Sequence, residues 1–190
     1  MNPIRRFNQL LARARKRKAS FCDAVALATV AKSGTPSVRM MLLKGANAGG
    51  FRFFTNLQSR KADELKKNAN AALCFWWPKL NEQVRVEGRV KRVGEKEADA
   101  YFAARPRGSQ IGAWASQQSK SLTSRRALLQ TAAAFAKLFK GKKIPRPPFW
   151  SGFVLVPTRI EFWRGKPDRL HERTLYARKK NGWRAKMLFP

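Results

Sequence analysis

Two groups of basic and hydroxyl side chains in this chain of 190 residues have the make-up of anion-binding sites. The first lies in segment 55–61 (TNLQSRK), where a strand pattern passes into the start of a helix. Free backbone N–H groups and the positive end of the helix dipole favour an anion there, and Arg60 and Lys61 add full charges. In so basic a chain, an Arg-Lys pair is equally typical of a solvated helix face, so both interpretations stay open.

The second group consists of Tyr101, Arg105 and Ser109. Tyr101 and Arg105 are four residues apart and share a helix face, and Pro106 ends that helix, so Ser109 lies near the start of the next one. A guanidinium, a phenol and a hydroxyl are donors that suit a phosphate dianion. The alternative is a core tyrosine with exposed charges beside it.

Two strand segments carry further candidates. Arg39 and Lys44 flank an apolar run, but their odd spacing puts them on opposite faces of an ideal strand unless a bulge or bend intervenes. Arg169 and His171 are predicted to share one strand face, and Arg173 continues the row at a period of two. An all-polar row on one strand face indicates a site or an interface.

The usual catalytic sets are absent from the sequence. There is one histidine, no GxSxG or Walker-type loop, and neither Cys22 nor Cys74 has metal-like spacing or a neighbouring histidine. We therefore interpret the cysteines as small buried hydrophobic residues and expect no metal site. Because side chains alone do not provide the hard chemistry, a cofactor is expected to carry it.

The periodicity predicts an α+β protein with an antiparallel sheet or barrel, formed by one domain (1–190) that begins with a basic helix or arm (1–20). The expected helices span 2–15, 59–67 (with Ser59 as N-cap), 95–104, 109–116 and 124–139. The expected strands span 24–30, 37–43 and 50–55, interpreted as a meander, then 71–77, 83–93, 152–164, 169–178 and 183–189.

The charge is abnormal, because 41 Lys and Arg against 11 Asp and Glu give a formal net charge of +30. The basic residues recur at turns and helix faces along the whole chain, so we predict a general cationic surface, natural or engineered, with nonspecific binding of polyanions. No apolar run approaches the roughly 20 residues that cross a bilayer, and no secretory signal is evident. A cytoplasmic protein without membrane partners is expected.

Six segments together resemble the pyridoxamine 5′-phosphate oxidase family, from about residue 24 to residue 190. They are RMMLLK (39–44), FFTNLQSRKA (53–62), EQVRVEGR (82–89), YFAARPRGSQIGAWASQQS (101–119), PPFWSGF (147–153) and RIEFWRGKPDRLHER (159–173). The resemblance implies an FMN-binding split β-barrel, antiparallel and Greek-key-like with flanking helices. It also implies a homodimer with FMN at the subunit interface.

The resemblance further implies the residues of the site, some of them from the partner subunit. The FMN-binding residues would be Arg39, Met40, Met41, Leu42, Leu43, Lys44, Phe54, Thr55, Arg60, Lys61, Gln83, Gln118, Ser119, Trp163 and Arg173. The substrate-binding residues would be Lys44, Tyr101, Arg105, Ser109, Arg169, Leu170 and His171. Arg169 and His171 would be the catalytic residues, covering the pyridine ring as orienting and electrostatic groups.

The implied reaction is oxidation of pyridoxamine or pyridoxine 5′-phosphate to pyridoxal 5′-phosphate, a step of vitamin B6 metabolism. A hydride would pass from substrate C4′ to flavin N5, and O2 would reoxidise the flavin with release of hydrogen peroxide. Only about twenty residues precede the first strand, so the N-terminal arm that covers the substrate in this family is expected to be short or missing. The alternatives are a flavin reductase-like split-barrel protein and a non-catalytic polyanion binder.

Overall fold

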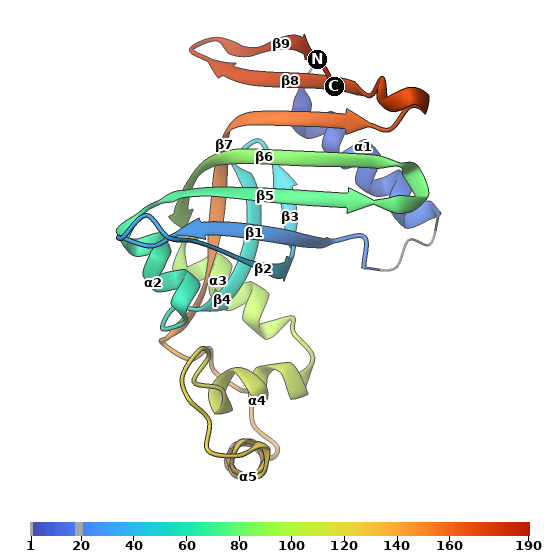
Figure 1. Cartoon of the computed structure of the whole chain (residues 1–190). Helices are drawn as coiled ribbons and strands as arrows, with labels where there is room; N and C mark the ends of the chain where they lie inside the picture. Colours follow the sequence, from blue (N-terminus) through green and yellow to red (C-terminus); the bar gives the residue numbers. More distant parts are fainter. Residues whose placement is uncertain (1, 18–20) are drawn as a thin grey trace.

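Nine antiparallel strands form one sheet in the described part of the protein, residues 2–17 and 21–190 of a computed structural model (Figure 1). The strands are β1 (Ala24–Val30), β2 (Pro36–Leu42), β3 (Gly45–Asn47), β4 (Gly50–Asn56), β5 (Asn70–Trp77), β6 (Glu82–Arg92), β7 (Trp150–Arg164), β8 (Glu172–Lys179) and β9 (Gly182–Leu188). Their order is β2-β1-β5-β6-β7-β4-β3, with β8 on β7 and β9 on β8. The predicted antiparallel α+β architecture is confirmed.

The sheet divides at β7, the longest strand. Residues 150–155 of β7 pair with β4, whereas residues 159–164 pair with β8. Pro157 lies between these halves and has no N–H to donate to a ladder. Opposite it, the register of β6 shifts at Gly88, where an added Cβ would lie 2.1 Å from the Val156 carbonyl oxygen. A proline and an obligatory glycine therefore set the point at which β7 changes partners.

The predicted meander of the first three strands is wrong in its third member. β1 and β2 pair as a hairpin, but β4 pairs with β7 and with β3, a short strand in the segment that we expected to be a loop. The backbone changes partners after β2: the Leu43 N–H donates to Asp23 O at 2.8 Å, and the Lys44 N–H donates to Arg52 O at 2.8 Å. The first bond extends the β1–β2 pair and the second extends the β3–β4 pair, which lie at opposite ends of the strand order. The peptide bond between Leu43 and Lys44 therefore joins these two ends, and the sheet curls into a barrel.

Helix α1 (Pro3–Lys16) packs its apolar face into the core of this curled sheet. Phe7 is fully buried, and its ring lies 4.9 Å from that of Phe51 and 4.8 Å from that of Phe75, between centroids. The side chain of Asn2 caps the helix by accepting from the Ile4 N–H at 2.9 Å. Part of the predicted basic arm, residues 1 and 18–20, lies outside the described residues.

The remaining helices lie around the other end of the sheet (Figure 1). They are α2 (Arg60–Lys67), α3 (Glu95–Ala103), α4 (Arg107–Ala115) and α5 (Arg125–Leu138). Helix α5 has no buried residue and is held against α4 by rings, with Trp114 5.6 Å from Phe135 between centroids. Among the described helices, none has the length and apolar character needed to span a bilayer.

The predicted strand at 169–178 starts too early, because β8 begins at Glu172. Arg169 ends a short 3-10 turn (Pro167–Arg169) and has a φ of +59°, so it does not share a strand face with His171. The turn is closed by His171 Nδ1, which accepts from the Lys166 N–H at 3.1 Å. Asp168 and Arg169 both have a positive φ, which takes the backbone out of the extended conformation, so the period-two row does not extend back from Arg173 to Arg169.

Candidate active site

A cavity of about 970 Å³ lies between β2, β4, α3 and α4. It is lined by most of the candidate residues of these elements: Met40, Met41, Leu42, Lys44, Phe54, Thr55, Tyr101, Arg105, Ser109 and Gln118. Both anion-site groups inferred from spacing thus reach one cavity, the second directly and the first through Thr55. Helix α1 contributes no lining residue, because its apolar face is used in the core.

The bend after β2 brings Lys44 to the cavity but not Arg39. Lys44 follows the partner change at Leu43, which turns the chain from β1 towards β4, so the required bend is present. The terminal nitrogens of Arg39 instead donate to Thr29 Oγ1 at 2.5 Å and Ser37 Oγ at 2.6 Å, and none of these three residues lines the cavity. Leu43 also lies outside the lining, because its side chain is buried in the core.

Three stacked aromatic rings build the part of the cavity near Arg105. Phe54 stacks on Tyr101 with centroids 4.0 Å apart and on Trp150 at 5.5 Å. The Arg105 guanidinium lies 4.8 Å from the Trp150 ring centroid, a cation–π contact. An added Cβ on Gly152 would lie 2.6 Å from Phe54 Cδ1, so glycine is what allows the Phe54 ring to lie against this backbone.

The guanidinium of Arg105 has unused hydrogen-bonding capacity. Its Nη1 is buried and has no hydrogen-bond partner among the described residues. Burial lowers the pKa of Arg105, and the nearby Tyr101 opposes this shift. A buried N–H donor without an acceptor is costly, so the position favours an anionic acceptor in the cavity. Ser109, in the first turn of α4, adds a hydroxyl on the same lining.

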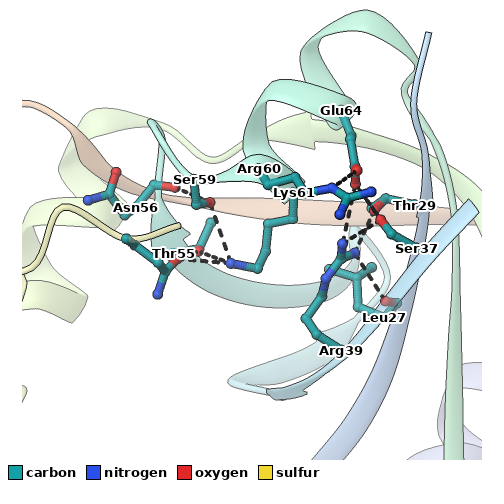
Figure 2. A network of polar contacts seen from close by, with 11 residues as sticks. Leu27, Thr29, Ser37, Arg39, Thr55, Asn56, Ser59, Arg60, Lys61 and Glu64 are labelled. Carbon is teal, nitrogen blue, oxygen red and sulfur yellow. Dashed lines mark hydrogen bonds and ion pairs between the residues drawn. The ribbon is translucent and has the colours of Figure 1, made fainter. Parts of the chain in front are cut away.

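Lys61 lies at the opposite part of the site, at the start of α2 (Figure 2). It is 7% exposed, and its Nζ donates to Gln118 Oε1 at 2.9 Å and Thr55 Oγ1 at 3.2 Å. Burial and then the charge of Arg39 lower its pKa to about 8, although Glu64 acts in the opposite direction. No ion pair joins Lys61 to a carboxylate in the described structure, so this buried ammonium also favours an added anion.

Ser59 is the N-cap of α2 as predicted, but its side chain does not cap the helix. Its hydroxyl donates backwards to Asn56 O at 2.7 Å. The Ser59 side chain therefore does not satisfy the first N–H groups of α2. These groups remain available to an anion, which a binding site at a helix start requires.

Glu64 is the residue that the sequence analysis missed. This carboxylate is 4% exposed and accepts from Thr29, Ser37 and Arg39 on Oε2 and from Arg60 Nε on Oε1, the last at 2.8 Å. Burial would raise its pKa, but these hydrogen bonds and the Arg39 charge outweigh burial and lower the pKa to about 2. The spacing of Arg60 and Glu64, one helical turn apart, was the available signal.

A separate group of candidates lies outside the cavity lining, on β6, β7, β8 and the turn before β8. It consists of Gln83, Trp163, Arg169, Leu170, His171 and Arg173. Trp163 lies opposite both Gln83 and Arg173 in the strand registers, and its ring is 4.6 Å from that of His171. Arg60, Lys61 and Ser119 also lie outside the lining; Ser119, with a φ of +72°, directly follows Gln118.

Solved structures with the same architecture define the class of the protein. The chain is similar to PhzG from Burkholderia lata 383, solved with tetrahydrophenazine-1-carboxylic acid, with a TM-score of 0.95 and 33% identity over 100% of this chain and 93% of that one. A pyridoxamine 5′-phosphate oxidase-related, FMN-binding protein from Nostoc punctiforme has a TM-score of 0.78 at 20% identity over 96% of each chain. The fold is that of a split-barrel protein.

Sequence comparisons then give the family. Residues 14–139 match the model for pyridoxamine 5′-phosphate oxidase, and residues 150–190 match that for the pyridoxine 5′-phosphate oxidase C-terminal dimerisation region. Two pyridoxine/pyridoxamine 5′-phosphate oxidases align with 100% of this chain. The one from Myxococcus xanthus is 52% identical and 92% of its length is covered, and the one from Anaeromyxobacter dehalogenans is 53% identical and 96% of its length is covered. The chain belongs to the pyridoxine/pyridoxamine 5′-phosphate oxidase family.

Proposed function

We propose that this protein is a homodimeric, FMN-dependent oxidase that converts pyridoxamine or pyridoxine 5′-phosphate to pyridoxal 5′-phosphate with O2 as acceptor. The observation that carries this proposal is a pair of anion-seeking cations: Arg105 lines the cavity, and Lys61 is hydrogen-bonded to its lining residues Thr55 and Gln118. Lys61 is a buried ammonium with neutral hydrogen-bond partners, and Arg105 has a buried Nη1 without a partner in the described structure. A phosphorylated cofactor and a phosphorylated substrate would satisfy one each.

The cavity residues fit FMN. Its volume of about 970 Å³ exceeds what one small substrate needs, and the apolar side chains Met40, Met41 and Leu42 offer a surface for a flat ring system. We assign the flavin phosphate to Lys61, Arg60 and the first turn of α2, with Thr55, Gln118 and Ser119 beside it. The chemistry that FMN supplies when bound is acceptance of a hydride from substrate C4′.

The substrate phosphate is assigned to Lys44, Tyr101, Arg105 and Ser109. Arg105 would donate its unpaired Nη1 hydrogens, and the stack of Phe54 on Tyr101 fixes the phenol at the same anion. These four donors come from α3, the turn after it, α4 and the bend after β2, and together they would orient the dianion and hold the rest of the substrate in one pose.

The remaining candidates are assigned to the partner subunit. Gln83, Trp163, Arg173 and the segment 169–171 lie outside the cavity of their own chain, and most of them fall within the match to the dimerisation region. Leu170 and Phe189 expose 70% and 93% of their surface, as expected of residues that a second copy covers. His171 accepts on Nδ1, so a neutral His171 carries its proton on Nε2 and can donate it to the pyridine ring's substituents.

A second candidate function follows from the similarity to PhzG, which was solved with a tricyclic carboxylic acid. An oxidase acting on such a ring would need one anion contact and a larger apolar surface. The second phosphate-binding group, Tyr101, Arg105 and Ser109, favours the phosphorylated pyridine instead.

Flavin content and turnover test the proposal. Purified protein is expected to bind FMN with visible flavin absorbance and to release hydrogen peroxide with pyridoxine 5′-phosphate, but far more slowly with unphosphorylated pyridoxine. A protein that cannot be loaded with FMN would contradict the proposal. Faster oxidation of tetrahydrophenazine-1-carboxylic acid than of pyridoxine 5′-phosphate would favour the second candidate.

A further inference from the structure

Glu64 joins three elements of the fold through one buried carboxylate (Figure 2). Oε2 accepts from Thr29 of β1 at 2.5 Å and from Ser37 and Arg39 of β2 at 2.7 and 3.2 Å. Oε1 faces the other way and accepts from Arg60 of α2 at 2.8 Å. The carboxylate thus holds both Arg39 and Arg60, on the opposite side of Lys61 from Thr55 and Ser59.

We propose that Glu64 is a positioning residue for the flavin phosphate, which it serves by holding the guanidinium groups of Arg39 and Arg60 beside Lys61. This inference rests on the proposed function, because it takes an FMN phosphate as the anion at α2. Glu64 itself does not contact the flavin. It acts through the two arginines, and mainly through Arg60.

The exposure of Arg60 explains why it needs a positioning partner. Its side chain is 63% exposed, whereas that of Glu64 is 5% exposed, and their bond is a one-turn pair within α2. A free arginine at such a surface position has many rotamers, and immobilising it opposes binding. Arg39 needs less help, because its terminal nitrogens are also bonded to Leu27 O, Thr29 and Ser37.

Glu64 also reduces the repulsion between Arg39 and Lys61. The charge of Arg39 lowers the pKa of Lys61, so these groups repel each other before any anion is bound. The carboxylate offsets this repulsion, since Glu64 raises the pKa of Lys61. Simple Coulombic competition predicts the opposite role, in which an acid near the phosphate weakens FMN binding. The sign of the effect of removing the acid therefore separates positioning from competition.

Glu64→Gln is the informative substitution because the two oxygens have different partners. The amide oxygen can replace Oε2 and keep the three donors from β1 and β2. The amide NH2 then faces Arg60 Nε, and two donors cannot bond. The substitution should release Arg60 while leaving the buried side of the network in place.

The experiment compares FMN with riboflavin, which lacks the phosphate, on apo protein, using quenching of flavin fluorescence to measure each Kd. In E64Q the ratio of the riboflavin Kd to the FMN Kd should fall about tenfold, as expected when a partner that orients a charged ligand contact is lost. The riboflavin Kd should stay unchanged. Asp63→Asn is the matched control, because it removes the same charge from the neighbouring position. Among the described residues Asp63 forms an ion pair only with the exposed Lys67, at 2.8 Å, so the ratio should not change.

A double mutant tests whether Glu64 acts through Arg60. Arg60→Ala should lower the ratio, and adding E64Q to it should lower the ratio little further if Glu64 acts mainly through Arg60. An unchanged or increased ratio in E64Q would overturn the proposal, as would equal weakening of FMN and riboflavin, which indicates a merely structural role. If E64Q does not fold, Ser37→Ala takes its place, with a smaller fall expected and no fall overturning the proposal. Wild-type protein with no preference for FMN over riboflavin would instead refute the proposed function.

Discussion

The affinity for FMN should depend on the protonation of Lys61. Burial and the charge of Arg39 lower the pKa of this ammonium to about 8 from its ordinary 10.5. A phosphate dianion favours the charged form, so bound FMN should raise this pKa again. FMN binding then requires a proton on Lys61 in the range between the two values. As the pH rises through 8, the free protein loses this proton and its affinity for FMN decreases.

The magnitude follows from the two pKa values. The protonated fraction of Lys61 in the free protein falls from about 0.9 at pH 7 to about 0.03 at pH 9.5, so the apparent Kd should rise about 30-fold. The phosphate itself is already a dianion over this range, because its second pKa is about 6. The effect is therefore assigned to the protein and not to the ligand.

Fluorescence titration of apo protein with FMN, at intervals from about pH 7 to 9.5, measures this dependence. Lys61→Arg is the control, because a guanidinium stays charged throughout and should give a flat profile. Riboflavin, which lacks the phosphate, should also give a flat profile with the wild type. A wild-type FMN affinity that does not change up to pH 9.5, or one that changes equally in K61R, would refute the assignment of Lys61 to the phosphate.

Three further predictions concern the two phosphate sites, the stacked rings of Phe54, Tyr101 and Trp150, and the net charge of the protein. Arg105→Ala should raise the KM for pyridoxine 5′-phosphate roughly 10- to 100-fold in steady-state assays with little flavin loss, whereas Arg60→Ala should mainly weaken FMN retention, measured by flavin absorbance; equal flavin loss in the two variants would show that the two phosphate sites are wrongly assigned. Gly152→Ala should displace the Phe54 ring, 2.6 Å from the added Cβ, and reduce stability by about 1–3 kcal/mol in thermal unfolding, and an unchanged Tm would contradict this geometry. With a net charge of +30, the protein should bind duplex DNA of any sequence and lose most of that affinity between about 50 and 200 mM salt, as fluorescence anisotropy can measure; a sequence preference would contradict a purely electrostatic interaction.

The sequence predicted the elements of this fold better than their partners. Alternation of apolar residues marks a strand wherever one face is buried, and β1 begins and ends as predicted, at Ala24 and Val30. The pairing of β4 with β7 joins residues about one hundred positions apart, and no local pattern carries that information. The early start predicted for β8 has a local cause, because Pro167 and Asp168 were turn signals that the row of basic residues obscured.

In the site, too, local groupings could be predicted from the sequence and long-range contacts could not. Spacing alone grouped Tyr101, Arg105 and Ser109, because residues on consecutive helix turns and the next helix start are close in sequence. It could not show which way Arg39 points, since that depends on Thr29 and Glu64 from two other elements. An acid in a helix with five other charged residues is normally solvated, and only the packing of α2 on β1 makes Glu64 a buried one.

The change of partners along β7 also limits how this protein can vary in length. One continuous strand carries Gly152 against Phe54 at the cavity and Trp163 against Arg173 near the predicted subunit contact. A one-residue insertion between them would exchange the two faces of the strand's second half, turning the core residue Phe162 outwards and Trp163 inwards. Loops such as the one between α5 and β7 can gain or lose residues without this effect. The number of residues from 152 to 163 is therefore fixed by geometry, unless the register shift beside Pro157 changes to absorb an added residue.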